Sequence, residues 1–312
     1  MRFPLGPGPY RDRLLDAMAW LLVDLHRSGV YWGDCSLANT LFRRDGDKIQ
    51  AFLVDAETSE LHPSLSDGQR MFDLDILVEN VAFGLADLAA LQGRPEGPEE
   101  AIELAETVRA RYAALWDEIT CEPELSPDDR HAIRARIRAL NDLGFAVDEI
   151  ALEPSAGGDG TIRLRVAVAN RRFHVRKLER LTGIVALEGQ ARLLLNDLEE
   201  YRAWIEYHEA RLLTDAEAAD RWLQAVLEPA LESLIPAIGP LRDPLQAYCD
   251  VLEEKWILSE MAGGDVGLEA AMEAYIGLGA PAPETTDQPA DSSIVLDIDW
   301  STGFDRPSPV LE

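Results

Sequence analysis

The stretch from Leu25 to Asp55 constrains the fold of this 312-residue chain more than any other part of the sequence. Apolar residues at steps of three and four predict a helix from Arg11 that ends in a left-handed turn at Gly29. Two short strand-like segments follow, and the Asp-Gly pair between them is a strong hairpin signal. Such a hairpin brings Asn39 and Asp55 to the same end of its two strands.

Three side chains of this stretch, Asp34, Asn39 and Asp55, together point to one kind of chemistry. An acid and an amide stand five positions apart after the helix end, and a second acid closes the second strand. Phosphoryl transfer uses one carboxylate to accept the substrate hydroxyl proton, and an amide plus a second carboxylate to hold magnesium. An Asp followed five residues later by Asn is common in proteins, so the signal depends on the complete set.

Two runs of residues carry a likeness to known proteins: WGDCSLANTLFRR (32–44) and VDAET (54–58). They resemble the catalytic and metal-binding segment of the protein-kinase-like superfamily, in the variant found in lipopolysaccharide-kinase and aminoglycoside-phosphotransferase types. More closely, they resemble a bacterial family in which such a segment precedes an uncharacterised C-terminal domain.

The resemblance implies a role for each site residue. Asp34 would be the catalytic base, while Asn39 and Asp55 would bind the cofactors Mg²⁺ and ATP, both as ligands of the metal. His26 would have a structural role, locking the helix end against the loop, which agrees with the alternative that it is an ordinary core histidine.

The sequence departs from the superfamily pattern around the catalytic acid. Trp32 and Gly33 replace the usual His-Arg pair, so control through a phosphate-sensing arginine is not expected. Ser36 and Ala38 stand two and four residues beyond Asp34, where protein kinases place a cation that neutralises the moving phosphoryl group. That charge would have to come from nearby basic residues: Arg43, Arg44 or Lys48.

The segment before the motif lacks the features of an N-terminal lobe. Only 33 residues precede Asp34, with no Gly-rich loop, strand lysine or glutamate partner among them. Phe3–Pro9 lies where the interlobe hinge would be. We therefore expect a C-terminal lobe only, and weak or absent turnover unless an N-terminal lobe exists upstream.

Beyond the motif, helical spacing dominates. Ile162–Ala169 alternates with the period of a half-buried strand, Phe173 and Val175 alternate again to predict a second hairpin, and Phe145–Leu152 is a candidate for a further strand. Ser126 before a proline predicts a helix N-cap. Helices are expected at about 72–91, 98–119, 127–142, 187–211, 215–235 and 243–261, and from about 265.

These patterns predict a mainly α fold with small β-hairpins (α+β). We expect four parts: a kinase-like C-lobe segment (1–92), a helical continuation (93–142), a C-terminal α+β accessory domain of unknown function (143–279) and a disordered acidic tail (280–312).

Composition excludes several classes of partner. The net charge of −28, from 29 basic and 57 acidic residues, argues against nucleic acid and anionic membranes. The sequence shows no secretory signal or membrane-spanning segment, so we expect a cytoplasmic protein. The three cysteines are far apart and the five histidines lack ligand spacing, which indicates neither a disulfide framework nor a zinc site. A protein partner of the C-terminal domain stays open.

Seven of the 29 basic residues fall within 18 positions, which is a second candidate site. The cluster could hold an anionic substrate or partner, or it could be the solvent face of a hairpin paired with acids, and the second interpretation is favoured. Its members are Arg163, Arg165, Arg171, Arg172, Arg176, Lys177 and Arg180.

Two functional hypotheses follow. The first is an ATP- and Mg²⁺-dependent phosphotransferase acting on a small-molecule or glycoconjugate hydroxyl, which the set Asp34, Asn39 and Asp55 favours. The second is a non-catalytic kinase-like scaffold that binds nucleotide or a protein partner, which the missing lobe and the missing loop cation favour.

Overall fold

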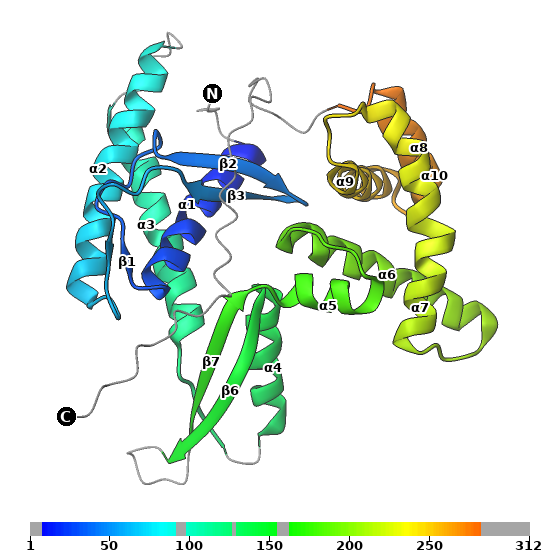
Figure 1. Cartoon of the computed structure of the whole chain (residues 1–312), viewed down its shortest axis with the longest axis horizontal. Helices are drawn as coiled ribbons and strands as arrows, with labels where there is room; N and C mark the ends of the chain where they lie inside the picture. Colours follow the sequence, from blue (N-terminus) through cyan, green and yellow to red (C-terminus); the bar gives the residue numbers. More distant parts are fainter. Residues whose placement is uncertain (1–7, 92–97, 127–128, 155–161, 282–312) are drawn as a thin grey trace, which may run out of the picture.

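Helices dominate the computed structural model, and its strands form small antiparallel sheets, so the predicted mainly α fold with small β-hairpins is confirmed. None of the helices in the described ranges has the length and apolar composition that a membrane span requires. The predicted acidic tail lies outside the described residues from 282 onward. The structure describes residues 8–91, 98–126, 129–154 and 162–281 (Figure 1).

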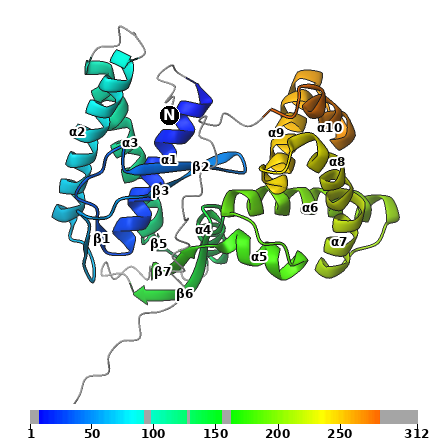
Figure 2. The ribbon, with the colours of Figure 1, turned by 45° about the horizontal axis from the view of Figure 1, so that its top comes forward.

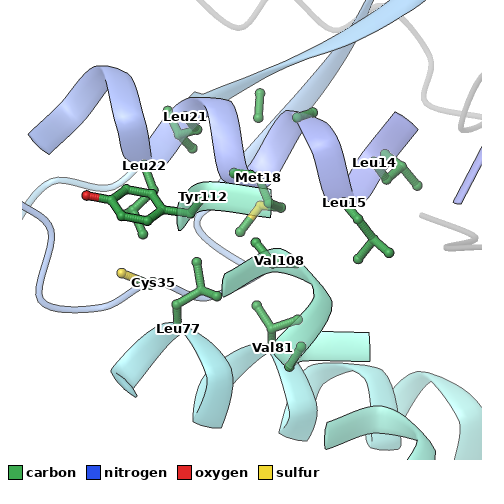
Figure 3. Packing of buried hydrophobic residues seen from close by; sticks show 14 of the residues in the cluster. Leu14, Leu15, Met18, Leu21, Leu22, Cys35, Leu77, Val81, Val108 and Tyr112 are labelled. Carbon is green, nitrogen blue, oxygen red and sulfur yellow. The ribbon is translucent and has the colours of Figure 1, made fainter. Parts of the chain in front are cut away.

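The first hydrophobic core is built by three helices: α1 (Pro9–Arg27), α2 (Asp67–Leu91) and α3 (Pro98–Thr120). The apolar stripe of α1 buries Leu14, Met18 and Leu22 almost completely, as its spacing predicts. Figure 3 shows this stripe facing side chains of the other two helices, among them Leu77 of α2 and Val108 of α3. This packing places α2 beside the end of α1, where the motif loop begins.

The predicted hairpin between Asn39 and Asp55 is present. Strands β2 (Thr40–Asp45) and β3 (Lys48–Leu53) pair antiparallel, with Thr40 opposite Leu53. The turn contains Gly46 at φ +62°, in the left-handed region that glycine adopts without strain.

A second, very short strand pair lies beside the motif. Strand β1 (Val30–Tyr31) pairs with β4 (Glu60–Leu61) in antiparallel orientation. The His62 amide also donates to the Gly29 carbonyl (2.8 Å), and a Cβ at Gly29 would lie 2.1 Å from the His62 carbonyl oxygen. Only glycine fits this close approach.

The middle of the chain forms a three-stranded sheet in the order β5-β7-β6, with α4 between β5 and β6 along the chain. The predicted pairing of the alternating strand with a segment through Phe173 is wrong, because Phe173–Thr182 is helix α5. Val175 and Leu178 are the buried residues on one face of that helix. Two alternating residues, Phe173 and Val175, were too few to distinguish the two-residue period of a strand from the 3.6-residue period of a helix. The elements are β5 (Glu124–Leu125), α4 (Arg130–Asp142), β6 (Phe145–Pro154) and β7 (Ile162–Arg171).

Two predicted helices differ in detail. Helix α4 is capped by Asp129, whose side chain accepts from the Ala132 amide (2.9 Å), and not by Ser126; residues 127–128 lie outside the described part. The helix predicted at 215–235 is interrupted by one π-helical turn, η1, at Leu223–Leu227.

A second core is formed by the C-terminal helices, which bury Trp222 and Tyr248 completely. The elements are α5 (Phe173–Thr182), α6 (Glu188–Glu209), α7 (Asp215–Trp222), η1, α8 (Glu228–Ile238), α9 (Pro244–Ala262) and α10 (Gly267–Gly277). Along the chain, the buried residues of the first core end at Phe145 and those of the second begin at Val175.

The tip of the β2–β3 hairpin joins the two cores, and Figure 1 shows it extending toward α6 and α9. The buried Asp45 carboxylate accepts from the amides of Gly189 (2.9 Å) and Gln190 (2.8 Å) at the start of α6. Gly46 exchanges two hydrogen bonds with the Gln246 side chain on α9 (2.8 and 2.9 Å). One hairpin therefore links the candidate site at one end to the C-terminal helices at the other.

Candidate functional site

Asp34 is held by two side-chain amides. Asn39 Nδ2 donates to Oδ2 (2.8 Å), and Asn80 Nδ2, from α2, donates to Oδ1 (3.1 Å). A carboxylate only accepts hydrogen bonds, so the amide nitrogens must face Asp34. Asn39 Oδ1, to which no group of the described residues donates, could then act as a ligand of a cation. The partly buried carboxylate is thus oriented on both oxygens.

The loop that carries Asp34 is anchored by Asp73 of α2, which is fully buried. Its oxygens accept from the backbone amides of Trp32 and Gly33 (both 2.8 Å) and from the Cys35 thiol (3.3 Å). Burial alone would raise the pKa of Asp73, but hydrogen bonds from His26, Trp32, Gly33 and Cys35 outweigh it and hold that pKa below its ordinary value. The residues just before Asp34 are therefore fixed to α2.

His26 completes this anchor. Its Nε2 donates to Asp73 Oδ2 (2.9 Å), and its Nδ1 lies 2.8 Å from the Tyr112 hydroxyl of α3. The ring is buried, and it connects α1, α2 and α3 at the helix end. This geometry is the structural role predicted for His26.

Asp55 and Asn39 lie at the same end of the hairpin, as predicted. The Val54 amide donates to the Asn39 carbonyl (3.1 Å), directly after the last strand pair. The Asp55 side chain is exposed, and its Oδ1 accepts from the Glu57 amide (3.1 Å). In the described residues the Asp55 carboxylate makes no hydrogen bond to Asp34, so a shared ligand would have to connect them.

The donor set at this end of the hairpin suits a hard cation. Asn39 Oδ1 and the Asp55 carboxylate are oxygen ligands, which Mg²⁺ binds together with several waters. Among the described residues, no group of three or more His, Cys, Asp or Glu side chains is arranged to hold a metal. A magnesium ion here would therefore depend on these two side chains, water and substrate phosphate.

Of the basic residues predicted to replace the loop cation, Arg44 and Lys48 lie at the far end of the hairpin, and Arg43 is exposed on β2. Arg44 forms an ion pair with Glu253 and lies 4.0 Å from Asp250, both on α9. It is four residues from Thr40, about 14 Å along the strand at roughly 3.4 Å per residue. Lys48 stands opposite Asp45 in the strand register, beside the turn. Neither Arg44 nor Lys48 reaches Asp34 in this arrangement.

Four members of the basic cluster at 163–180 lie within ion-pair distance of acids, as the favoured interpretation predicted, although one of them, Lys177, lies on helix α5 and not on a hairpin. Arg171 stacks on Trp20, 4.3 Å from the ring centroid, and lies 3.4 Å from Asp24. The other ion pairs are Arg163–Glu124 (4.0 Å), Arg165–Glu122 (3.4 Å) and Lys177–Glu199 (3.5 Å).

Sequence reasoning missed Asp73 and Asn80, although a signal for both was present. They are seven residues apart on the stripe of α2 that also carries the buried Leu77. A carboxylate and an amide on the apolar face of a helix require hydrogen-bond partners. The sequence alone does not show which loop supplies the hydrogen-bond partners of Asp73 and Asn80.

Comparison with known proteins identifies the larger, C-terminal part of the chain. The profile of a family described as a domain of unknown function (DUF4032) matches residues 114–278, which is more than half of the sequence. The chain belongs to this family. The DUF4032 match runs from the end of α3 through α10 and does not include Asp34, Asn39 or Asp55. No curated protein and no solved structure matches the chain.

Proposed function

We propose that this chain provides the proton-accepting and metal-binding side of an ATP- and Mg²⁺-dependent phosphotransferase acting on a small-molecule or glycoconjugate hydroxyl. The observation that supports it most is the pair of amide hydrogen bonds that orients Asp34. In this proposal Asp34 accepts the hydroxyl proton, and Asn39 Oδ1 and Asp55 hold magnesium.

The residues of the chain would contribute mainly by positioning. Asn39 and Asn80 fix both oxygens of Asp34, and Asp73 fixes the backbone just before it, so the carboxylate needs little reorganisation to accept a proton. Magnesium, when bound, would neutralise charge on the nucleotide phosphates. Asn39 would then link the base to the metal, because its Nδ2 donates to Asp34 while its Oδ1 would bind the magnesium ion.

A specific observation favours the alternative, a non-catalytic kinase-like scaffold that binds nucleotide or a protein. Ser36 and Ala38 carry no positive charge, and Arg44 is engaged by Glu253 at the other end of the hairpin. Phosphoryl transfer without a nearby cation would be slow. The scaffold predicts Mg²⁺-ATP binding without turnover, or no nucleotide binding at all.

Nucleotide binding can be tested by thermal shift with Mg²⁺-ATP. The proposal predicts that wild-type protein is stabilised and that Asp55→Ala loses most of this shift, because stabilisation follows ligand affinity. Glu57→Ala is the matched control, since it removes a neighbouring exposed carboxylate but keeps the backbone amide that Asp55 accepts from. A shift that survives Asp55→Ala unchanged would refute the metal-binding role.

A further inference from the structure

The second core contains a groove of about 1050 Å³ that the proposed phosphotransfer site does not use. It is lined by α6, η1, α8, α9 and α10, which Figures 1 and 2 show gathered in one part of the molecule. Its apolar lining includes Val226 of the π-helical turn, Met272, Ile276 and Trp204, the last of which is 56% exposed. Drug-sized ligands occupy sites of roughly 300–1,000 Å³, so this groove lies at the upper end of that range.

Carboxylates border the apolar lining on two sides. Asp197 and Glu200 come from α6, Asp265 lies just before α10, and Glu269 and Glu273 lie on α10. Glu269 and Glu273 are four residues apart, which places them on one helix face about 6 Å apart at 1.5 Å rise per residue. The groove therefore carries two negative charges one helical turn apart, with Asp265 before the start of the same helix.

The chain already places one cation between these two walls. Lys255 Nζ of α9 lies 3.7 Å from Glu200 on one side and 3.7 Å from Asp265 on the other. An ammonium group thus fits between the walls at this end. Glu269 and Glu273 follow on α10, and neither forms an ion pair within the described residues.

Asp197 is fixed in place at the groove by buried donors. Its Oδ2 accepts both from Trp222 Nε1 and from the Tyr248 hydroxyl (2.7 Å each), and both of those residues are fully buried. Two hydrogen bonds to one oxygen orient the carboxylate before any ligand arrives, which lowers the cost of binding a cation.

We propose that this groove binds a basic amphipathic helix of a partner protein. The apolar lining accepts an apolar helix face, and the acids at turn spacing match Lys or Arg side chains at i and i+4. The segment 282–312 of the chain itself is a poor occupant, because its seven acids against one arginine give it a negative charge that the acidic groove would repel. This proposal does not depend on the proposed phosphotransfer.

The test measures binding of a labelled synthetic peptide to the full chain by fluorescence anisotropy. The probe is an amphipathic helix of about 18 residues with Leu at i, i+3, i+4 and i+7 and Lys on both flanks. We expect E269K/E273K to weaken binding at least about tenfold. The control E99K/E103K makes the same charge change at the same spacing on exposed α3 positions, and should change affinity less than about threefold.

A second variant tests the apolar lining, and thermal melts confirm that each protein is folded. Trp204→Ala should weaken the same peptide about fivefold or more. Absence of peptide binding, equal weakening by both charge variants, or equal binding of a scrambled peptide of the same composition would overturn the proposal. Spermine bound as tightly as the peptide and unaffected by Trp204→Ala would also overturn it, in favour of a small polyamine site.

Discussion

Among single residues, Asp73 is the one that anchors the structure around the candidate site. One buried carboxylate receives hydrogen bonds from two backbone amides, a histidine and a thiol. Such a group stabilises the fold only while all of its partners are present, because an unmatched buried donor costs the full desolvation penalty. Asp34, in contrast, is partly exposed and oriented by two amides that can adjust.

Asp73→Asn should therefore destabilise the protein by roughly 2–4 kcal/mol, because the amide directs an N–H group at donors and loses the charge. Urea denaturation measures the effect. The matched control is Asp75→Asn on the same helix, where an exposed carboxylate pairs with Arg109 (2.9 Å), and the expected cost is below about 1 kcal/mol. Equal costs for the two variants would contradict the anchoring role of Asp73.

At the scale of elements, the β2–β3 hairpin is the connection between the candidate site and the C-terminal helices. Its strand ends carry Asn39 and Asp55, while its turn packs against the start of α6. The turn and the helix approach so closely that a Cβ at Gly189 would lie 2.3 Å from the Asp45 carbonyl oxygen. Displacement of α6 would therefore be transmitted to the hairpin.

Gly189→Ala should lower the free energy of unfolding by about 1–3 kcal/mol, because the added methyl group has no room. Gly68→Ala is a closely matched control: Gly68 is likewise the second residue of its helix, but a Cβ there meets no atom within 4 Å. That control should be neutral or stabilising, since alanine favours the helix. Stabilisation by both substitutions, seen in urea unfolding curves, would show that the hairpin and α6 do not pack this closely.

At the scale of the whole molecule, the junction between the cores contains a buried acid, Asp250. Burial raises its pKa to about 6, although Gln246, Arg44 and Arg242 partly oppose this. Because the pKa is higher in the folded state, its contribution to stability is fully present below the unfolded pKa of about 3.8 and is lost as pH rises through about 6.

Asp250→Asn should remove the loss of folding stability that the ionisation of Asp250 causes as the pH rises. The variant keeps an oxygen for the Gln246 amide (2.9 Å in the wild type), so it should gain up to roughly 3 kcal/mol relative to wild type between pH 4 and pH 7. Unfolding free energies measured across this range test the prediction. Parallel curves for the two proteins would mean that Asp250 titrates alike in the folded and unfolded chains.

The parts of this fold that depend on local periodicity were predictable from the sequence. The stripe of α1 and the Asp-Gly hairpin were of this kind, and the hairpin also predicted the proximity of Asn39 and Asp55. Contacts across long sequence separations were not predictable: Asp73 meets the Trp32 amide 41 residues away. The two-residue alternation at Phe173 and Val175 was misleading, because packing against α6 stabilises this segment as helix α5.

Asp34→Asn tests whether Asp34 accepts a proton in Mg²⁺-dependent phosphoryl transfer. The measurement pairs Mg²⁺-ATP binding with γ-phosphate turnover over a panel of hydroxyl acceptors. We expect the variant to bind Mg²⁺-ATP within about threefold of wild type but to lose turnover by about a hundredfold or more. Equal turnover by both proteins, or wild-type protein that neither binds nor turns over Mg²⁺-ATP, would contradict this role of Asp34.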